Sequence, residues 1–350
     1  MYIIELYRLV NGTLERMEEI IDYTGLQFYN KLNGTGGLQF YLNTGARKAM
    51  LDNLYRYRTQ VVVKNNNTIV WFGPLTKLYG RYQNVEGFLN FNARTYLDHL
   101  NARTVSSEYL QTDAGEIAWS AIDEVQNRDN GDLVITEGDI QSTVLRDRKY
   151  YYKSVSELIV ELANVNNGFD FSLNATVDSS NRFTGVNFNV YQELGSVRND
   201  LNTLQMGINV NNIEFATKDS IYNYITVIGS GFSEEENILS IAESTASQQG
   251  FTRREDVIKY ADISIQETLD ERAYEALLDG QSEQYDINIG LIPNKRPTDG
   301  EYILGDTLNI DLALPDSTLR FTGSGRVVEI NTTVDDVGVG KITPKLQFYK

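Results

Sequence analysis

The residue types that most often perform chemistry in enzymes are scarce in this sequence. Histidine occurs once, as His99 in the stretch Tyr96–Leu100, and cysteine is absent. A Ser-His-Asp triad or a histidine zinc site must therefore use His99 alone, and zinc sites rarely have a single imidazole ligand. The absence of cysteine excludes disulfides, thiolate metal sites and cysteine nucleophiles. We expect His99 to pack or cap a helical segment and not to act in catalysis.

Glycine-rich and acidic stretches predict neither a phosphate loop nor a calcium site. Short glycine pairs occur at residues 229–231, 323–325 and 338–340. None completes a GxGxxG pattern or carries the Lys-Ser/Thr ending of a phosphate loop, so all are predicted to be turns. Asn127–Asp132 has the composition of a calcium loop. An EF-hand frame counted from Gly131 nevertheless places Gln126 and Arg128 where carboxylates are required, so no metal and no cofactor are predicted.

Carboxylates and tyrosines are abundant enough to leave one enzymatic alternative open. The chain has 48 acidic residues and 22 tyrosines. Paired carboxylates cleave glycosidic bonds, and tyrosines can line sugar grooves, although they are also common at protein–protein interfaces. A glycan-binding or glycan-cleaving cell-wall protein is therefore the alternative to the main hypothesis below, in which the chain is not an enzyme.

Length, composition and charge indicate an acidic, soluble protein of two or three domains. The 350 residues are 41% hydrophobic, and no apolar run approaches the ~18 residues that a membrane span needs. The start, MYIIELYRLV, lacks the long apolar core of a signal peptide, so we expect synthesis in a cytoplasm. Residues 206–350 hold 12 basic and 24 acidic side chains, a balance of −12 within a net charge of −17. Because such a chain repels phosphate backbones, specific nucleic-acid binding is not expected.

The first hundred residues have the pattern of strands with one inserted helix. Asn11-Gly12 marks a hairpin, and residues 38–42 form a later strand. Thr44 can cap a helix that runs to Tyr57, and another strand lies within Arg81–Asn92. This order predicts a small, partly closed β-barrel with a helix across one opening.

The stretch VVVKNNNTIVWFGPL, residues 61–75, is a second hairpin with an unusual pattern. Two apolar runs flank a Lys-Asn-Asn-Asn turn, and neighbouring positions within each run are both apolar. A hairpin with one wet face alternates apolar and polar residues instead. Both faces of this hairpin must therefore be covered by other parts of the protein.

Residues 93–205 have the pattern of a small α+β domain. Two helical patches and a strand pair are indicated, at residues 94–103, 114–125, 169–174 and 185–191. The clearest helix of the chain starts at Ser154, where Ser154 and Glu157 match a capping box. An Asn-Asn-Gly sequence at Asn166–Gly168 ends it.

Strand signals return from residue 206 onward. Residues 233–250 are acidic and polar and are expected to form an exposed loop, and Thr268 and Glu271 match a second capping box. The alternation over Val327–Val334 and Ile342–Phe348 is the most regular β pattern of the chain. The sequence thus predicts a mainly β chain with α+β insertions, divided into residues 1–92, 93–205 and 206–350, with an inserted loop and helix at about 232–285.

The order of these segments is similar to that of a known family. A strand of the form GGLQFYLN precedes a short helix, and the hairpin VVVKNNNTIVWFGPL ends in Phe-Gly before a proline. The segments EFATKDSIYNYITVIGSG, LDERAYEALLDG, YILGDTLNI and GRVVEINTTV follow in that order. Over its whole length the chain resembles the tail hub proteins of long-tailed bacteriophages. That family is related to the baseplate hub of contractile phages and to the amino-terminal part of tail-associated lysins.

The resemblance implies an architecture and a set of partners. Residues 1–92 and 206–350 become two tail-tube-like β-barrel domains joined by the α+β domain. Three chains form a homotrimeric ring of six barrels at the distal tail tip of the virion. A distal tail or tube protein lies above the ring, a tail fibre, spike or lysin protein lies below it, and the tape measure protein occupies the channel. An injection system or a gene-transfer particle has the same physical design, and the sequence does not separate these from a phage.

Two further expectations concern activity and the channel. Tail-associated lysins continue beyond the hub into a peptidase or glycosidase, whereas here Lys350 follows directly on the last strand, so no cell-wall-cutting activity is expected of this chain. DNA passes through the ring during ejection, and acidic side chains along the channel are expected to repel its phosphates.

The ring also offers an explanation for the hairpin at residues 61–75. One face of the hairpin then lies in a barrel core and the other against a helix or a neighbouring barrel. The alternative is that the helix at residues 44–57 alone covers the second face within one chain. The subunit-interface candidates are Val62, Val70, Trp71, Phe72, Leu75 and Val327.

Overall fold

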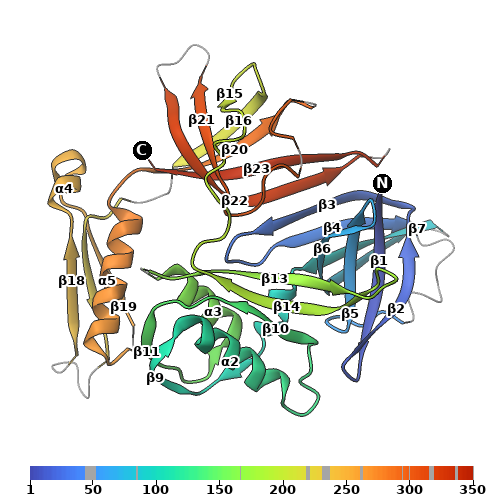
Figure 1. Ribbon diagram of the computed structural model, residues 1–350, viewed down its shortest axis with the longest axis horizontal. Helices are drawn as coiled ribbons and strands as arrows, with labels where there is room; N and C mark the ends of the chain where they lie inside the picture. The colour runs from blue at the N-terminus through green and yellow to red at the C-terminus, as the bar shows by residue number, and fades with distance from the viewer. Residues whose placement is uncertain are drawn as a thin grey trace.

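The computed structural model describes residues 1–43, 53–83, 86–165, 167–217, 221–230, 237–260, 263–293, 295–298, 300–314, 319–335 and 338–349 (Figure 1). The chain is mainly β with small helical insertions, as predicted. Its hydrophobic residues gather into four cores, which define a first β-unit, a connecting unit, a second β-unit and an inserted unit. The helix predicted for residues 44–57 falls mostly outside the described ranges.

The first β-unit contains seven strands in the order β3-β4-β7-β6-β5-β1-β2. The strands are β1 (Tyr2–Val10), β2 (Thr13–Ile20), β3 (Tyr23–Lys31), β4 (Gly37–Asn43), β5 (Thr59–Asn65), β6 (Thr68–Gln83) and β7 (Glu86–Arg94). Asn11 and Gly12 both have positive φ, as the predicted Asn-Gly turn requires. The long β6 pairs with β5 through its first half and with β7 through its second half.

The two faces of the β5–β6 hairpin enter two different cores. Val61 and Trp71 pack inside the first β-unit, whereas Val62 packs with the connecting unit. The ring centroid of Phe72 lies 5.3 Å from that of Phe183 in the connecting unit. The second face is therefore covered by another part of the same chain. A neighbouring subunit is therefore not needed to cover it, and the helix predicted at residues 44–57 lies mostly outside the described residues.

The connecting unit places two helices beside short sheets. Its elements are a 3-10 helix η1 (Tyr96–Leu100), β8 (Thr104–Val105), β9 (Glu108–Asp113), α2 (Ala114–Gln126), β10 (Ile135–Ile140), β11 (Leu145–Lys149), β12 (Lys153–Ser154), α3 (Val155–Asn164), β13 (Asp170–Val177) and β14 (Phe183–Tyr191). The helical patch predicted for residues 94–103 is only the short η1. Asp113 caps α2 by accepting from the backbone N–H groups of Gly115 and Glu116.

The capping box predicted at Ser154 is wrong, although the start of the helix is right. Ser154 occupies the N-cap position of α3 but makes no side-chain cap bond. Its hydroxyl donates instead to the Asn101 carbonyl oxygen at 3.1 Å, because η1 ends beside it. A tertiary contact thus replaces the local bond that the sequence pattern predicts.

The second β-unit and the inserted unit share the last part of the chain. The second β-unit contains β15 (Leu204–Gln205), β16 (Val210–Thr217), β20 (Gln284–Leu291), β21 (Thr307–Ala313), β22 (Arg320–Val334) and β23 (Gly340–Tyr349). The inserted unit contains β17 (Tyr224–Ile228), β18 (Leu239–Glu243), α4 (Thr245–Phe251), β19 (Glu255–Lys259) and α5 (Gln266–Gly280). The described part of the loop predicted at 233–250 is therefore wrong, because β18 and α4 lie there.

The two β-units repeat one strand arrangement. Each has a layer of four antiparallel strands, β3-β4-β7-β6 in the first and β16-β20-β23-β22 in the second. In both layers the chain visits the positions in the order first, second, fourth and third. The long strands β6 and β22 also match, since each begins paired with a strand outside the layer, β5 or β21. The inserted unit occupies the place that a short turn between β3 and β4 holds in the first β-unit.

The registers of the two layers match residue by residue. In the first layer Phe28 pairs with Leu38, Leu38 with Ala93, and Ala93 with Leu75. The row in the second layer that has the same pairing consists of Phe215, Ile287, Leu346 and Val327. A bulge follows the last pair of each row, after Leu75 in β6 and after Val327 in β22. The two β-units are therefore structural repeats of one module.

Candidate functional site

The two β-units are joined edge to edge through β3 and β22 (Figure 1). These strands pair antiparallel, with Phe28 opposite Thr332, and both side chains are buried. The Leu32 N–H also donates to the Val328 carbonyl oxygen at 2.9 Å. Main-chain hydrogen bonds thus make one sheet of the two modules and fix their relative position.

One face of this shared sheet is polar along a row that crosses the seam. Successive cross-strand partners in β22, β3, β4, β7 and β6 are Thr333, Gln27, Gln39, Asn92 and Lys77. The Asn92 side chain donates to Asn90 Oδ1 at 3.0 Å. The opposite face is apolar, and Phe40 and Phe91 stack there with ring centroids 4.6 Å apart. This row of the polar face therefore consists mainly of amide and hydroxyl groups.

Asp170 of β13 ties the connecting unit to both β-units. Its side chain is 6% exposed and forms an ion pair with Arg326 of β22. Asn33, in the turn after β3, donates to Asp170 Oδ1 at 2.7 Å, and the Leu194 N–H donates to Oδ2 at 2.6 Å. Asn33 Oδ1 in turn accepts from the Phe171 N–H at 3.1 Å. One buried carboxylate therefore holds three parts of the chain at one point.

A cavity of about 880 Å³ lies beside this point. Its lining comes from the first β-unit, the connecting unit and the second β-unit, and includes Val70, Phe72, Phe171, Tyr191, Leu304 and Ile330. The three units therefore do not fill the space between them. The polar contacts around the cavity therefore contribute to the junction where apolar packing between the units is incomplete.

A second buried ionic contact joins the first β-unit to the β13–β14 hairpin. Glu5 and Lys64 are both buried, and Lys64 Nζ lies 2.8 Å from Glu5 Oε2. Lys64 also donates to the Asn181 carbonyl oxygen at 2.6 Å. The Tyr7 hydroxyl donates to Glu5 Oε2 at 2.8 Å and accepts from the Phe183 N–H at 3.1 Å. Burial, with the neighbouring Glu5, raises the pKa of Tyr7 to about 12, so this hydroxyl stays protonated.

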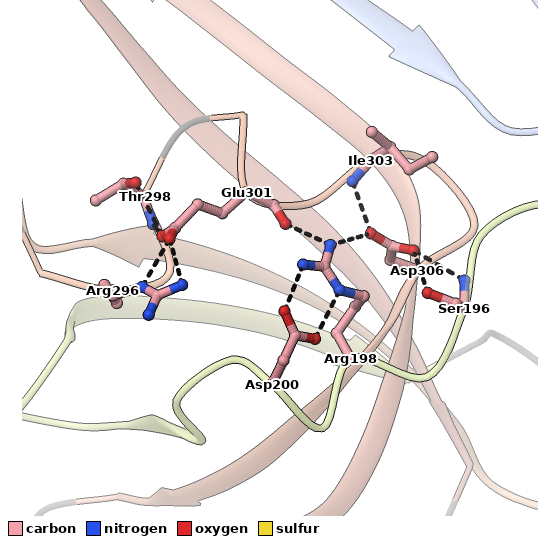
Figure 2. A network of polar contacts seen from close by, with 8 residues as sticks. All are labelled: Ser196, Arg198, Asp200, Arg296, Thr298, Glu301, Ile303 and Asp306. Atoms are coloured by element: carbon pink, nitrogen blue, oxygen red, sulfur yellow. Dashed lines mark hydrogen bonds and ion pairs between the residues drawn. The ribbon is translucent and has the colours of Figure 1, made fainter.

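The chain leaving the connecting unit is held to the second β-unit by an arginine network (Figure 2). Arg198 pairs with Asp200 through two hydrogen bonds of 2.9 and 2.8 Å and with the buried Asp306 at 3.1 Å. Asp306 also accepts from the Ser196 N–H at 2.9 Å and from the Ile303 N–H at 3.0 Å. These contacts raise the pKa of Arg198 and lower that of Asp200.

The same network fixes the loop before β21. Arg296 pairs with Glu301 at 2.6 Å, and Glu301 Oε2 accepts from the Thr298 N–H at 2.6 Å. The hydrogen bond from Arg296, with those from Thr298, lowers the pKa of Glu301 to about 2. The backbones of Gly195 and Gly305 approach each other closely here. A Cβ on Gly195 would lie 2.3 Å from the Gly305 carbonyl carbon, so a larger residue does not fit.

A cluster of buried arginines joins the inserted unit to the connecting unit. Arg146 and Arg148 lie on one face of β11 and are 3% and 4% exposed. Both pair with Glu271 of α5, with Arg148 Nη2 at 3.1 Å from Glu271 Oε2. Thr268 accepts from Arg148 Nη1 at 3.1 Å. Thr268 and Glu271 therefore form this contact, and the capping box predicted for them is wrong, since α5 begins at Gln266.

A second ion pair extends this cluster to α3. Arg272 of α5 is buried and pairs with Glu161 of α3, and it also lies 3.0 Å from Glu275. We call Arg146, Arg148, Glu161, Thr268, Glu271 and Arg272 the arginine latch. The latch connects α5 with both β11 and α3, so it holds the inserted unit from two directions.

His99 is buried in η1, where the sequence predicts a packing residue. Its Nε2 donates to Gln60 Oε1 at 3.1 Å, and its ring packs edge-on against Tyr96 with centroids 4.8 Å apart. Burial, with a smaller contribution from the positive charge of Arg103, lowers the pKa of His99 to about 3. The imidazole is therefore neutral in the folded chain at neutral pH.

This burial predicts a pH dependence of stability. In the unfolded chain the imidazole takes up a proton near pH 6.5, whereas the folded chain does not do so until about pH 3. Stability therefore falls as the pH drops from 6.5 toward 3, by up to about 1.4 kcal/mol per pH unit from this group. Urea unfolding at pH 7, 6 and 5 should show this slope in the natural chain and a smaller one in His99→Gln. An equal slope in the variant would contradict the assignment.

The interface candidates from the sequence lie mostly inside the chain. Val62, Trp71, Leu75 and Val327 are buried in the cores of the units. A side chain that its own chain buries has no surface left for a second subunit, so these four act in internal packing. Val70 and Phe72 are half-buried and line the cavity beside the seam.

The residues that join the units were missed by sequence reasoning. Asp170 is flanked by Phe169 and Phe171 in a predicted strand, and a lone carboxylate in an apolar strand is a signal that it is buried with a partner. Arg146 and Arg148 alternate along β11 and so share one face, a second signal of the same kind. Asp306 and Glu271 carry no such signal.

The described ranges contain neither a cluster of metal-binding side chains nor a membrane-spanning helix. They contain no group of three or more His, Cys, Asp or Glu side chains that could hold a metal ion. They also contain no helix that is both long enough and apolar enough to cross a membrane. The stretch Asn127–Asp132, considered above for calcium, forms the turn after α2, where Asp132 Oδ1 accepts from the Val134 N–H at 2.8 Å.

Comparison with known proteins gives matches in structure but not in sequence. No known protein family and no curated protein matches the sequence. A 43 kDa prophage tail protein from Shewanella oneidensis has a similar structure, with a TM-score of 0.64, 12% identity and 98% of each chain covered. A tail protein from Neisseria meningitidis matches with a TM-score of 0.61, 9% identity and coverage of 99% of this chain and 96% of that one.

A third similar structure belongs to a secretion system. It is an Escherichia coli component of the type VI secretion system, itself described as similar to the bacteriophage T4 tail proteins gp27 and gp5. The TM-score is 0.52 with 10% identity, over 97% of this chain and 76% of that one. These likenesses span both β-units, the connecting unit and the inserted unit. The chain therefore has the fold of phage tail proteins.

Proposed function

We propose that this chain is a structural tail hub protein without catalytic activity. Three copies form a ring at the distal end of a tail tube, within a virion or a related particle. The observation that carries this proposal is the pair of repeated modules in one sheet, in a fold that matches tail proteins over nearly the whole chain. Because each chain contains two modules, three chains contain six similar modules, which match the symmetry of a sixfold tube.

The partners follow from the position of such a ring. A distal tail or tube protein contacts one side, and a fibre, spike or lysin protein contacts the other. The tape measure protein and then DNA occupy the channel. The inserted unit lies away from the shared sheet, beside the connecting unit (Figure 1), and is available for a peripheral contact.

The polar face of the shared sheet is the surface we assign to the channel. Its central row offers amides and hydroxyls between two lysines, Lys77 of β6 at one end and Lys341 of β23 next to Thr333 at the other, and so has few groups that bind phosphate. In this proposal the row across the seam contains no acidic side chain, so the acidic wall predicted from net charge is not retained for this surface. The −17 net charge of the chain adds a weak long-range repulsion of DNA.

The oligomeric state tests the proposal directly. We expect light scattering after size exclusion to give three times the 39.7 kDa of one chain, and electron micrographs to show threefold rings with a central opening. Mass spectrometry of purified particles should find the chain among the tail proteins. A monomer in solution together with its absence from purified particles would overturn the hub proposal.

A further inference from the structure

The repeat leaves one strand edge of each module without a partner in the described chain. The seam uses β22 of the second module and β3 of the first. The outer edges of the four-stranded layers are then β16 at one end and the second half of β6, residues 77–81, at the other. Open edges of this kind are ready to pair with another strand.

Both open edges display exposed apolar or aromatic side chains, and on β16 the equivalent residue of the repeat is buried. Phe215 of β16 is 41% exposed, whereas Phe28, its equivalent in β3, is 5% exposed beneath the seam. On the other edge Tyr79 is 54% exposed and Leu78 is 36% exposed. The difference arises because β22 covers Phe28, and nothing in the described chain takes the corresponding place over Phe215.

The seam inside the chain supplies a template for the missing contact. Counting from the matched bulges, Gly80 of β6 is equivalent to Thr332 of β22, and Tyr79 is equivalent to Asn331. At the seam Thr332 lies opposite Phe28. The same arrangement between two copies puts Gly80 of one chain opposite Phe215 of the next.

We infer that β16 of one copy pairs antiparallel with residues 77–81 of β6 in the next copy, in the register of the seam. The pairs are Leu78 with Thr217, Tyr79 with Ala216, Gly80 with Phe215 and Arg81 with Glu214. The contact is head to tail, because different strands meet, so repetition closes a ring or extends a fibre. Closure at three copies rests on the proposed function, whereas the pairing itself rests on the repeat.

The chemistry of the paired side chains agrees with this register. Arg81 and Glu214 are both exposed and have opposite charge, and directly opposed charges stabilise a strand pair. Gly80 has no side chain, so the Phe215 ring can lie across it and cover its backbone. Both features are independent of the bulges and the seam, which alone define the register.

Cysteine cross-linking tests the register, because the natural chain has no cysteine. Directly opposed residues in an antiparallel pair have Cα atoms about 4.5 to 5.5 Å apart, within the range of a disulfide. Full-length chain carrying Tyr79→Cys and Ala216→Cys, mildly oxidised, should give covalent dimers and trimers on a non-reducing gel. The pair Tyr79→Cys with Glu214→Cys, two residues out of register, should give few.

A cysteine pair at the seam inside one chain is the control that the oxidation conditions can form a disulfide between paired strands. Tyr29→Cys with Asn331→Cys joins the equivalent pair at the seam and should form an internal disulfide without covalent oligomers. Absence of intermolecular products from the in-register pair, when this control oxidises, overturns the pairing. A threefold mass in solution with that result leaves the hub proposal standing. A covalent ladder that continues beyond three supports the pairing and overturns the closed trimer.

Exchanging the charges of Arg81 and Glu214 tests the same contact, with the mass of the assembly in solution as the measurement. Arg81→Glu or Glu214→Arg places like charges opposite each other and should weaken association about tenfold at each interface. The double variant Arg81→Glu with Glu214→Arg restores opposite charges and should recover the mass of the natural chain. Equal masses for the two single variants and the natural chain at limiting concentration would overturn this contact.

Discussion

Replacing Asp170 by alanine should destabilise the chain by about 3 kcal/mol, because it leaves Arg326 without its buried partner. The Leu194 N–H and the Asn33 amide lose their acceptor in the same step, and unpaired buried donors add to the cost. The loss should appear as a lower urea midpoint and as faster hydrogen exchange on both sides of the seam. Because Arg326 is partly exposed, the expected loss of stability is at the lower end of the range for broken buried ion pairs.

Two matched variants locate the origin of this effect. Asp170→Asn retains one acceptor oxygen and should lose less stability than Asp170→Ala. Glu108→Gln removes an exposed carboxylate whose partner Lys149 lies 3.8 Å away, and it should leave the unfolding curve unchanged. If Asp170→Ala behaved like Glu108→Gln, the three-way contact would not hold the units together.

Replacing Glu271 by alanine should cost about 3 to 5 kcal/mol at the contact between the inserted and connecting units. Arg146 and Arg148 are almost wholly buried, and both depend on this carboxylate for charge compensation. We expect faster hydrogen exchange in α5 and β11, with the protection of the shared sheet retained. Hydrogen exchange followed by mass spectrometry of the full chain measures both regions at once.

A compensating variant checks that the uncompensated charge is the cause. Replacing the group by apolar residues, as Arg146→Leu, Arg148→Met and Glu271→Leu together, should recover most of the lost protection. Glu267→Ala, on the exposed side of the same helix, is the control for helix propensity and should have little effect. Loss of protection in the control equal to that in Glu271→Ala would contradict the role of the latch.

The fold class and the positions of three helices could be predicted from the sequence because they depend on local patterns. Periodicity located α2, α3 and α5 within a few residues, and the Asn11-Gly12 turn was predicted from backbone chemistry alone. The sequence predicts local caps for the hydroxyls of Ser154 and Thr268, whereas in the fold both hydroxyls bond to distant partners. Local patterns cannot distinguish these outcomes, because the competing partner is remote in sequence.

The contacts between units could not be predicted in the same way. The hairpin at residues 61–75 showed correctly that both of its faces need cover, but not which part of the chain supplies it. The two modules share no recognisable sequence motif, since one row consists of Phe28, Leu38, Ala93 and Leu75 while its equivalent has different residues at three of the four positions. The repeat is visible only in strand order and register, which the sequence does not display.

Only one of the two modules carries an insertion, and this affects how many copies of the insertion an assembly contains. The additional subdomain between β16 and β20 replaces a turn in only one of the duplicated halves. If three polypeptides close into the proposed ring, it offers six sectors of similar strand arrangement toward the tube but only three copies of the appended subdomain around its perimeter. In the proposed ring, one-sided insertion would in this way join a sixfold inner surface to a threefold outer one.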